Sequence, residues 1–134
     1  MSTITTIYTG ELRTKAKHNQ SGQEIITDAP VDNKGKGEAF SPTDLLAASL
    51  GSCALTIIGI AANEKGFSID GTKVEITKIM ASEPRRVGEI ILEFHFPKNN
   101  YSEREKSIIK NCVEHCPVSK SLHPDLKRTI IYNF

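Results

Sequence analysis

Residues 41–66 read SPTDLLAASLGSCALTIIGIAANEKG, and this stretch decides the fold. Its beginning carries helix signals. Ser41 is a favourable N-cap, a proline follows at the first helical position, and Asp44 completes an arrangement like a capping box. Gly66 is a natural C-terminal stop. The pattern therefore predicts one helix over residues 42–65, about 36 Å long at 1.5 Å per residue.

The middle of this helix, residues 45–62, is a run of eighteen residues without a charge. A membrane span needs about 20 predominantly apolar residues, so length alone admits one. Five Gly, Ser and Thr residues interrupt the run, and the remaining sequence is typical of an amphipathic folded protein. We therefore expect a helix buried on all sides within a protein core, and no membrane partner.

One chain is too small to bury such a helix completely. A compact chain of this length has a radius of gyration of about 14 Å, so the helix spans the whole domain. A small sheet covers only one side of it. The most economical cover for the other side is a second copy of the chain, and burial alone predicts a homodimer.

Length and composition limit the class of protein. The 134 residues fit a single domain, 1–134, with 17 Lys and Arg against 16 Asp and Glu and a net charge of +1. Nucleic-acid binders concentrate excess positive charge, so no nucleic-acid partner is expected. The N-terminus lacks the pattern of a secretory signal, and we expect a cytoplasmic protein with reduced cysteines.

The rest of the chain reads as strands and one more helix. Alternating and β-branched runs predict strands, the turn at 82–86 predicts a hairpin, and Ser102 with Glu105 forms a capping box that opens a second helix. Pro117 ends or restarts that helix. The expected fold is α+β, in the order βββ-α-ββ-α-β, with a largely antiparallel sheet around a long buried central helix. The expected strands are 3–9, 11–17, 24–27, 74–80, 87–96 and 126–132.

Three cysteines are the candidate reactive groups. Cys53 lies among Leu and Ile in the long helix, where a free cysteine is ordinarily a small hydrophobe, so a reactive thiolate there needs a nearby cation. Cys116 precedes a proline at the start of a helical turn, whose backbone N–H groups favour a thiolate. Cys112 falls on an apolar helix stripe and is expected in the core. For Cys53 and Cys116, the residue pattern leaves two roles open: packing in the core, or thiol chemistry.

A metal site is a further alternative. Sulfur and imidazole ligands occur together, although their spacing is not a usual zinc pattern, at Cys112, His115, Cys116 and His123. We expect no metal there. The other two histidines, His18 and His95, stand alone, and alternation with Phe94 and Phe96 predicts that His95 faces solvent.

Two blocks of sequence resemble a known family. Residues 41–53 look like the Pro-x-x-Leu helix start that leads into the first cysteine of the OsmC/Ohr superfamily, and Cys116-Pro117-Val118-Ser119 is similar to its second, Cys-Pro-x-Ser, cysteine. The chain resembles the less-characterised, osmotically inducible protein C-like branch. The resemblance implies an intertwined homodimer with the two long helices at its centre and sites at the subunit interface.

The resemblance also implies a reaction. Cys53 would attack the O–O bond of an organic hydroperoxide and become a sulfenic acid, and Cys116 would resolve it as a disulfide. A dithiol of the dihydrolipoyl type would then reduce the disulfide, with no bound cofactor. Better-known members carry a Glu, paired to an activating Arg, where this chain has Thr43, with a carboxylate at the next residue, Asp44.

Arg13 is the only arginine before the helix and is the candidate activating cation, with Arg85 and Arg86 as the other possibilities. Two functions follow. The first is thiol-dependent reduction of organic hydroperoxides by a cytoplasmic enzyme. The alternative is a non-enzymatic dimeric module that binds a small apolar ligand between its subunits, with cysteines that only pack.

Overall fold

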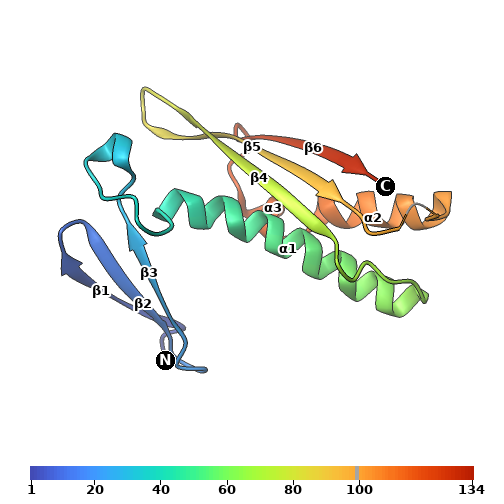
Figure 1. Ribbon diagram of the computed structural model, residues 1–134, viewed down its shortest axis with the longest axis horizontal. Helices are drawn as coiled ribbons and strands as arrows, with labels where there is room; N and C mark the ends of the chain where they lie inside the picture. Colours follow the sequence, from blue (N-terminus) through green and yellow to red (C-terminus); the bar gives the residue numbers. More distant parts are fainter. Residues whose placement is uncertain (99) are drawn as a thin grey trace. The chain divides into compact units, whose positions relative to one another are not determined.

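The computed structural model describes residues 1–98 and 100–134 and divides them into two compact units. The N-terminal unit comprises residues 1–46 and the C-terminal unit residues 47–134, and each is described by itself. Both are built from strands and helices, as Figure 1 shows. The α+β class and the predicted order of elements are therefore confirmed, and the helical restart at Pro117 forms the short helix α3 (Pro117–Ser121).

The N-terminal unit is a three-stranded antiparallel sheet. Its strands β1 (Ile4–Gly10), β2 (Arg13–His18) and β3 (Glu24–Asp28) pair in the order β1-β2-β3, and a 3-10 turn, η1 (Val31–Asn33), follows. The connection from β1 to β2 bends through Glu11 and Leu12, whose φ angles are 55° and 62°. Two left-handed residues in succession suit the twist of a tight hairpin, although neither of them is glycine.

Helix α1 (Pro42–Lys65) begins and ends where the sequence predicts. The Asp44 N–H donates to the Ser41 Oγ at 3.0 Å, and the Ser41 N–H donates to the Asp44 Oδ2, also at 3.0 Å. This reciprocal pair satisfies two N–H groups that would otherwise lack partners at the helix start. Gly66 follows the helix with φ at 80°, a conformation that glycine adopts without strain.

The C-terminal unit contains a second three-stranded sheet. Strands β4 (Lys73–Ala81) and β5 (Arg86–His95) form the predicted hairpin, and β6 (Lys127–Asn133) pairs with β5. The β5–β6 pair is parallel, because the chain crosses over through α2 (Glu103–His115) and α3 (Pro117–Ser121) before it returns. The expectation of one largely antiparallel sheet is thus refined to two sheets, of which the second is mixed.

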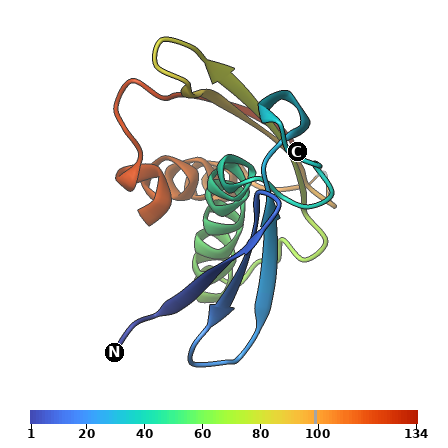
Figure 2. The same cartoon turned by 90° about the vertical axis from the view of Figure 1, so that its left-hand side faces the viewer.

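The core of the C-terminal unit lies between this sheet and its helices. Helices α1 and α2 lie on one face of the sheet, as Figure 2 shows most clearly. Phe94 and Leu92 of β5 and Ile109 of α2 are fully buried there. The helix approaches β4 closely at Gly51, where an added Cβ would lie 2.4 Å from Ile76 Cδ1. Helix α1 contributes a buried stripe of small and apolar residues: Ala47, Leu50, Gly51, Ala54, Ile58 and Ala62.

The opposite side of α1 stays uncovered within the C-terminal unit. Ile60 is 50% exposed, and a Cβ added at Gly59 would meet no described atom within 4 Å. The expected burial on all sides is therefore not complete within this unit. By length and composition alone α1 could cross a membrane, yet a core helix of a globular fold passes the same test, and its stripe packs against the sheet.

Candidate active site

Cys53 lies in the middle of α1, three residues beyond the fully buried Leu50. Its side chain is half-buried and packs at the edge of the hydrophobic core. The long helix is rigid at this point, because it is hydrogen-bonded over several turns on both sides of the residue. Cys53 therefore has a fixed position while part of its surface remains accessible.

Cys116 lies at the junction of α2 and α3, where Pro117 begins the second of these helices. Its backbone is extended, with φ at −66° and ψ at 148°, and the residue is completely buried. The missing N–H of Pro117 costs nothing at a first helical position, so the proline allows the chain to restart a helix directly after the cysteine. The predicted restart is confirmed.

The structure places the thiols of Cys53 and Cys116 close to each other. Burial is the main cause that raises the pKa of the Cys116 thiol, and a hydrogen bond with the Cys53 side chain raises it further. The backbone N–H groups of Ser119 and Val118 act in the opposite direction and lower this pKa. Two cysteines that are far apart in the sequence are therefore adjacent, which is the arrangement that a reversible disulfide requires.

Cys112, the third thiol, is buried in the core as predicted. Its pKa is raised by burial, so its reactive thiolate form is disfavoured.

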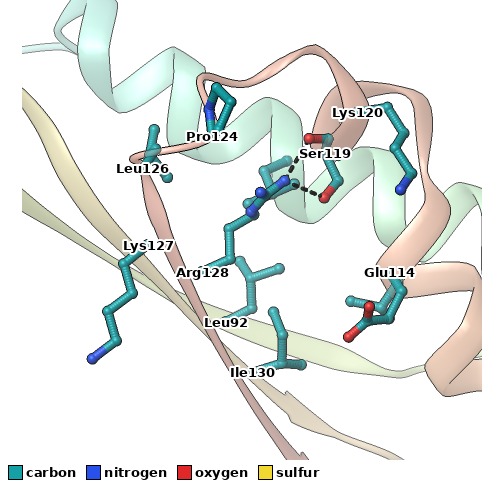
Figure 3. Close-up of a pocket in the computed structure, with 11 residues that line it drawn as sticks. Leu92, Glu114, Ser119, Lys120, Pro124, Leu126, Lys127, Arg128 and Ile130 are labelled. Carbon is teal, nitrogen blue, oxygen red and sulfur yellow. Dashed lines mark hydrogen bonds between the residues drawn. The ribbon is translucent and has the colours of Figure 1, made fainter.

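The turn after Cys116 is anchored from the sheet. Arg128 of β6 donates through Nη1 to the backbone oxygen and the hydroxyl of Ser119, as Figure 3 shows. A cavity of about 390 Å³ opens beside these groups, with an apolar wall that includes Leu92 and Ile130. Neither Cys53 nor Cys116 lines the cavity. Its charged lining comes from Glu114, Lys120, Lys127 and Arg128.

Arg13, the predicted cation, is held by two carboxylates in the N-terminal unit. Its Nε lies 2.7 Å from Asp28 Oδ1, and its Nη2 donates to Asp28 Oδ2 at 2.8 Å and to Glu38 Oε1 at 3.0 Å. The Glu38 N–H also donates to Asp28 Oδ2 at 3.1 Å. Among the described residues, Arg13 Nη1 has no hydrogen-bond partner, so one edge of the guanidinium remains available.

These contacts set the charge of the cluster. The hydrogen bond from Arg13 lowers the pKa of Asp28, whose side chain is only 2% exposed, and the same contact raises the pKa of Arg13. A buried carboxylate is stable only when it is paired, and here the bidentate arginine supplies the pair. Asp28 and Glu38 are thus the acidic partners of Arg13 within the N-terminal unit.

Thr43 and Asp44 serve the start of α1. The Thr43 hydroxyl lies 3.2 Å from the Ser41 hydroxyl, and Asp44 caps the helix. Arg86 is used in the hairpin turn, where its Nη1 donates to the carbonyl groups of Ser82 and Pro84. Arg85 lies in the same exposed turn. The structure thus brings together Cys53 and Cys116, while the role of Arg13 stays a prediction because it belongs to the other unit.

The alternative metal set does not form. Among the described residues, Cys112, His115, Cys116 and His123 are not grouped as ligands; His115 Nδ1 instead lies 3.0 Å from the Asn111 carbonyl oxygen. The expectation that His95 stands alone is wrong. Its Nε2 lies 3.1 Å from Glu75 Oε1, because the register of β4 and β5 places the two side chains on the same face of the sheet.

Sequence reasoning did not identify the carboxylate partner of Arg13. Asp28 is paired with Arg13 in the β2–β3 register, and an acid directly after the predicted strand 24–27 could have suggested this contact. The sequence gives no comparable indication that Arg128 binds Ser119, because this contact depends on the crossover that brings β6 back beside β5.

Comparisons with known proteins identify the family of the chain. The sequence profile of the family described as OsmC-like protein matches residues 35–130. A crystal structure of a candidate osmotic stress induced and detoxification response protein from Psychrobacter arcticus 273-4 is 53% identical, covers 99% of this chain and 96% of its own, and superposes with a TM-score of 0.95. A search of the curated proteins finds no match.

Two more distant structures share the fold. An organic hydroperoxide resistance protein from Legionella pneumophila is 17% identical over 100% of this chain and 98% of its own, with a TM-score of 0.77. The organic hydroperoxide resistance protein OhrB of Bacillus subtilis is 15% identical over 97% of this chain and 96% of its own, with a TM-score of 0.66. With the profile match and the 53% identical structure, the conclusion is that this chain belongs to the OsmC-like protein family.

Proposed function

We propose that the protein reduces organic hydroperoxides with its own thiols. The observation that carries this proposal is the contact between Cys53, which is partly accessible, and Cys116, which is buried. Relatives that share the fold are named for organic hydroperoxide resistance, which supports a substrate of this class. Family membership is consistent with redox activity of this kind.

The reaction has three steps. The Cys53 thiolate attacks one peroxide oxygen, so that an S–O bond forms, the O–O bond breaks and the alkoxide leaves as an alcohol after it takes a proton. The Cys116 sulfur then attacks the sulfenic sulfur, forms the S–S bond and releases water. A small dithiol of the dihydrolipoyl type reduces the disulfide through a mixed disulfide and is itself oxidised.

Arg13 is proposed as the cation that favours the Cys53 thiolate, and Asp28 and Glu38 as the groups that hold its guanidinium in place. Support comes from the bidentate contact and from the free edge at Nη1. A cation beside a thiol lowers the thiol pKa and increases the reactive fraction. Arg13→Gln should therefore slow hydroperoxide consumption, while Arg86→Gln, in the hairpin turn, should leave it unchanged.

The working unit is proposed to be a homodimer in the reducing cytoplasm. The uncovered side of α1 around Ile60 supports a second copy as its cover. Ile60→Asp should shift the protein from dimer to monomer in sedimentation velocity, and Ser107→Asp, on the exposed side of α2, serves as the matched control. A wild-type monomer at micromolar concentration would contradict this proposal.

The decisive assay is consumption of cumene hydroperoxide or tert-butyl hydroperoxide with dihydrolipoamide as reductant. Cys53→Ser should abolish turnover, Cys116→Ser should stop it after one equivalent, and Cys112→Ser should retain it. Mass mapping should find a Cys53–Cys116 disulfide in the oxidised wild type. An unchanged free-thiol titre after one equivalent of hydroperoxide would exclude the reaction and favour a non-enzymatic module that binds an apolar ligand.

A further inference from the structure

A second cluster of reactive side chains lies in the sheet of the C-terminal unit. Glu75 of β4 and Glu93 of β5 are directly opposite each other, and His95 is two residues further along β5. The His95 Nε2 lies 3.1 Å from Glu75 Oε1 and 3.7 Å from Glu93 Oε2. One ligand atom from each residue falls within 4.8 Å of the other two.

The opposed glutamates carry like charges that a cation between them would balance. Like charges that face each other across two strands destabilise a sheet, typically by a few tenths of a kcal/mol to about 1 kcal/mol. The nearest ammonium, Lys73 Nζ, lies 3.5 Å from Glu75 Oε1, but its side chain is 67% exposed. An exposed lysine contributes little to such a pair, because water screens its charge and its side chain loses entropy on binding.

The His95 ring nitrogen is the second observation. Its Nε2 is shielded from solvent and has no hydrogen-bond partner among the described residues. Glu75 is within ion-pair distance of this nitrogen, but the contact does not have the direction of a hydrogen bond. Buried ring nitrogens are ordinarily satisfied, so a nitrogen beside two carboxylates without a directed bond is suited to a metal ion.

The neighbouring strand supports this set. Asn133 of β6 is paired with His95 in the parallel register, and its Nδ2 donates to Glu93 Oε2 at 3.2 Å. A hydrogen bond to a carboxylate oxygen is one of the contacts that orient metal ligands in proteins. Three strands therefore contribute to one cluster.

We propose that Glu75, Glu93 and His95 bind one divalent transition-metal ion, with zinc as the best match. Zinc binds imidazole nitrogen and carboxylate oxygen at metal–ligand distances of about 2.0–2.2 Å. In a tetrahedral site, two ligand atoms at this distance from the metal lie about 3.3 Å from each other. The separations of 3.1 Å and 3.7 Å at His95 Nε2 are close to that value. Water completes the coordination, and the site is independent of the chemistry of Cys53 and Cys116.

Cobalt and zinc titrations of the reduced full-length protein test the proposal. Cobalt should give weak absorption bands of a nitrogen and oxygen site, without the sulfur-to-cobalt charge transfer that a cysteine site produces. In calorimetry, Glu93→Gln and His95→Asn should each weaken zinc binding by about tenfold or more. His123→Asn, which changes an exposed histidine outside the cluster, should leave the affinity unchanged.

Lys73→Gln should change the zinc affinity in the opposite direction from the ligand variants. The lysine competes with the metal for Glu75, so its removal should tighten zinc binding. Zinc should also raise the thermal midpoint of the wild type but not of Glu93→Gln. The proposal is overturned if the wild type binds no zinc below about 1 mM. It is equally overturned if Glu93→Gln, folded by circular dichroism, binds as the wild type does, or if sulfur-to-cobalt charge transfer dominates the spectrum.

Discussion

Joining Cys53 to Cys116 is expected to stabilise the fold by a calculable amount. The bridge would close a loop of about 64 residues, and the lost chain entropy of the unfolded state then corresponds to about 4 kcal/mol at 25 °C. A chain of 134 residues has an unfolding entropy of roughly 0.28 kcal/mol/K, so this gain is equivalent to an increase of about 15 °C in Tm. Both figures are upper limits, because strain in the bridge would reduce them.

The assay compares reduced protein with protein treated with one equivalent of diamide. Diamide forms disulfides without peroxide chemistry, so the measurement tests the contact of the thiols and not the proposed enzymatic activity. Intact mass should fall by two hydrogen atoms, and Tm by differential scanning calorimetry should rise. Cys112→Ser should show the same rise, because Cys53 and Cys116 are both retained, whereas Cys116→Ser should show neither a Cys53–Cys116 bridge nor a rise.

Two results would contradict this prediction. One is a Cys53–Cys116 disulfide, identified by mass mapping, that leaves Tm unchanged or lowers it. In that case the native backbone does not hold the two sulfur atoms at bonding geometry. If Cys112 forms the bridge with Cys53 instead, the pairing of Cys53 with Cys116 is wrong.

Three further measurements address the fold. Ser102→Ala removes the cap of α2 and should cost about 1 kcal/mol in urea unfolding, while the exposed Ser107→Ala should stay within about 0.5 kcal/mol; equal effects would contradict the capping role. Burial raises the pKa of Tyr132 from 10.0 to about 12, so the folded state retains this proton longer than the unfolded state, and stability should fall as pH rises from 10 to 12. Tyr132→Phe should flatten that decline, and an unaltered slope would assign it to other groups. The contact with Arg13 lowers the pKa of Asp28, so its contribution is present above the unfolded pKa and is lost as pH falls through the folded one; Asp28→Asn should remove this part of the acid transition, and a profile identical to the wild type would contradict it.

Local signals predicted the helices well. The capping box at Ser41 and the glycine at Gly66 place both ends of α1, and the box at Ser102 places the start of α2. These signals work because a helix end is satisfied by residues within one turn of it. The hairpin of β4 and β5 was predictable for a similar reason, since two alternating runs flank a short turn.

The pairing of distant segments was not predictable from residue patterns. The parallel return of β6 beside β5 depends on the crossover through α2 and α3, which a periodic pattern does not encode. The contact of Cys53 with Cys116 was implied only by the family resemblance, because the two residues lie on different helices.

The amino-acid sequence alone was enough to establish the α+β class, the element order and the excess of apolar surface on α1, because caps, turns and periodicity act over a few residues. The three-dimensional arrangement was needed to show which functional groups meet: Cys53 with Cys116, Arg13 with Asp28, and His95 with Glu75. Each of these pairs depends on strand register or helix packing, and a shift of one residue would turn a side chain to the opposite face.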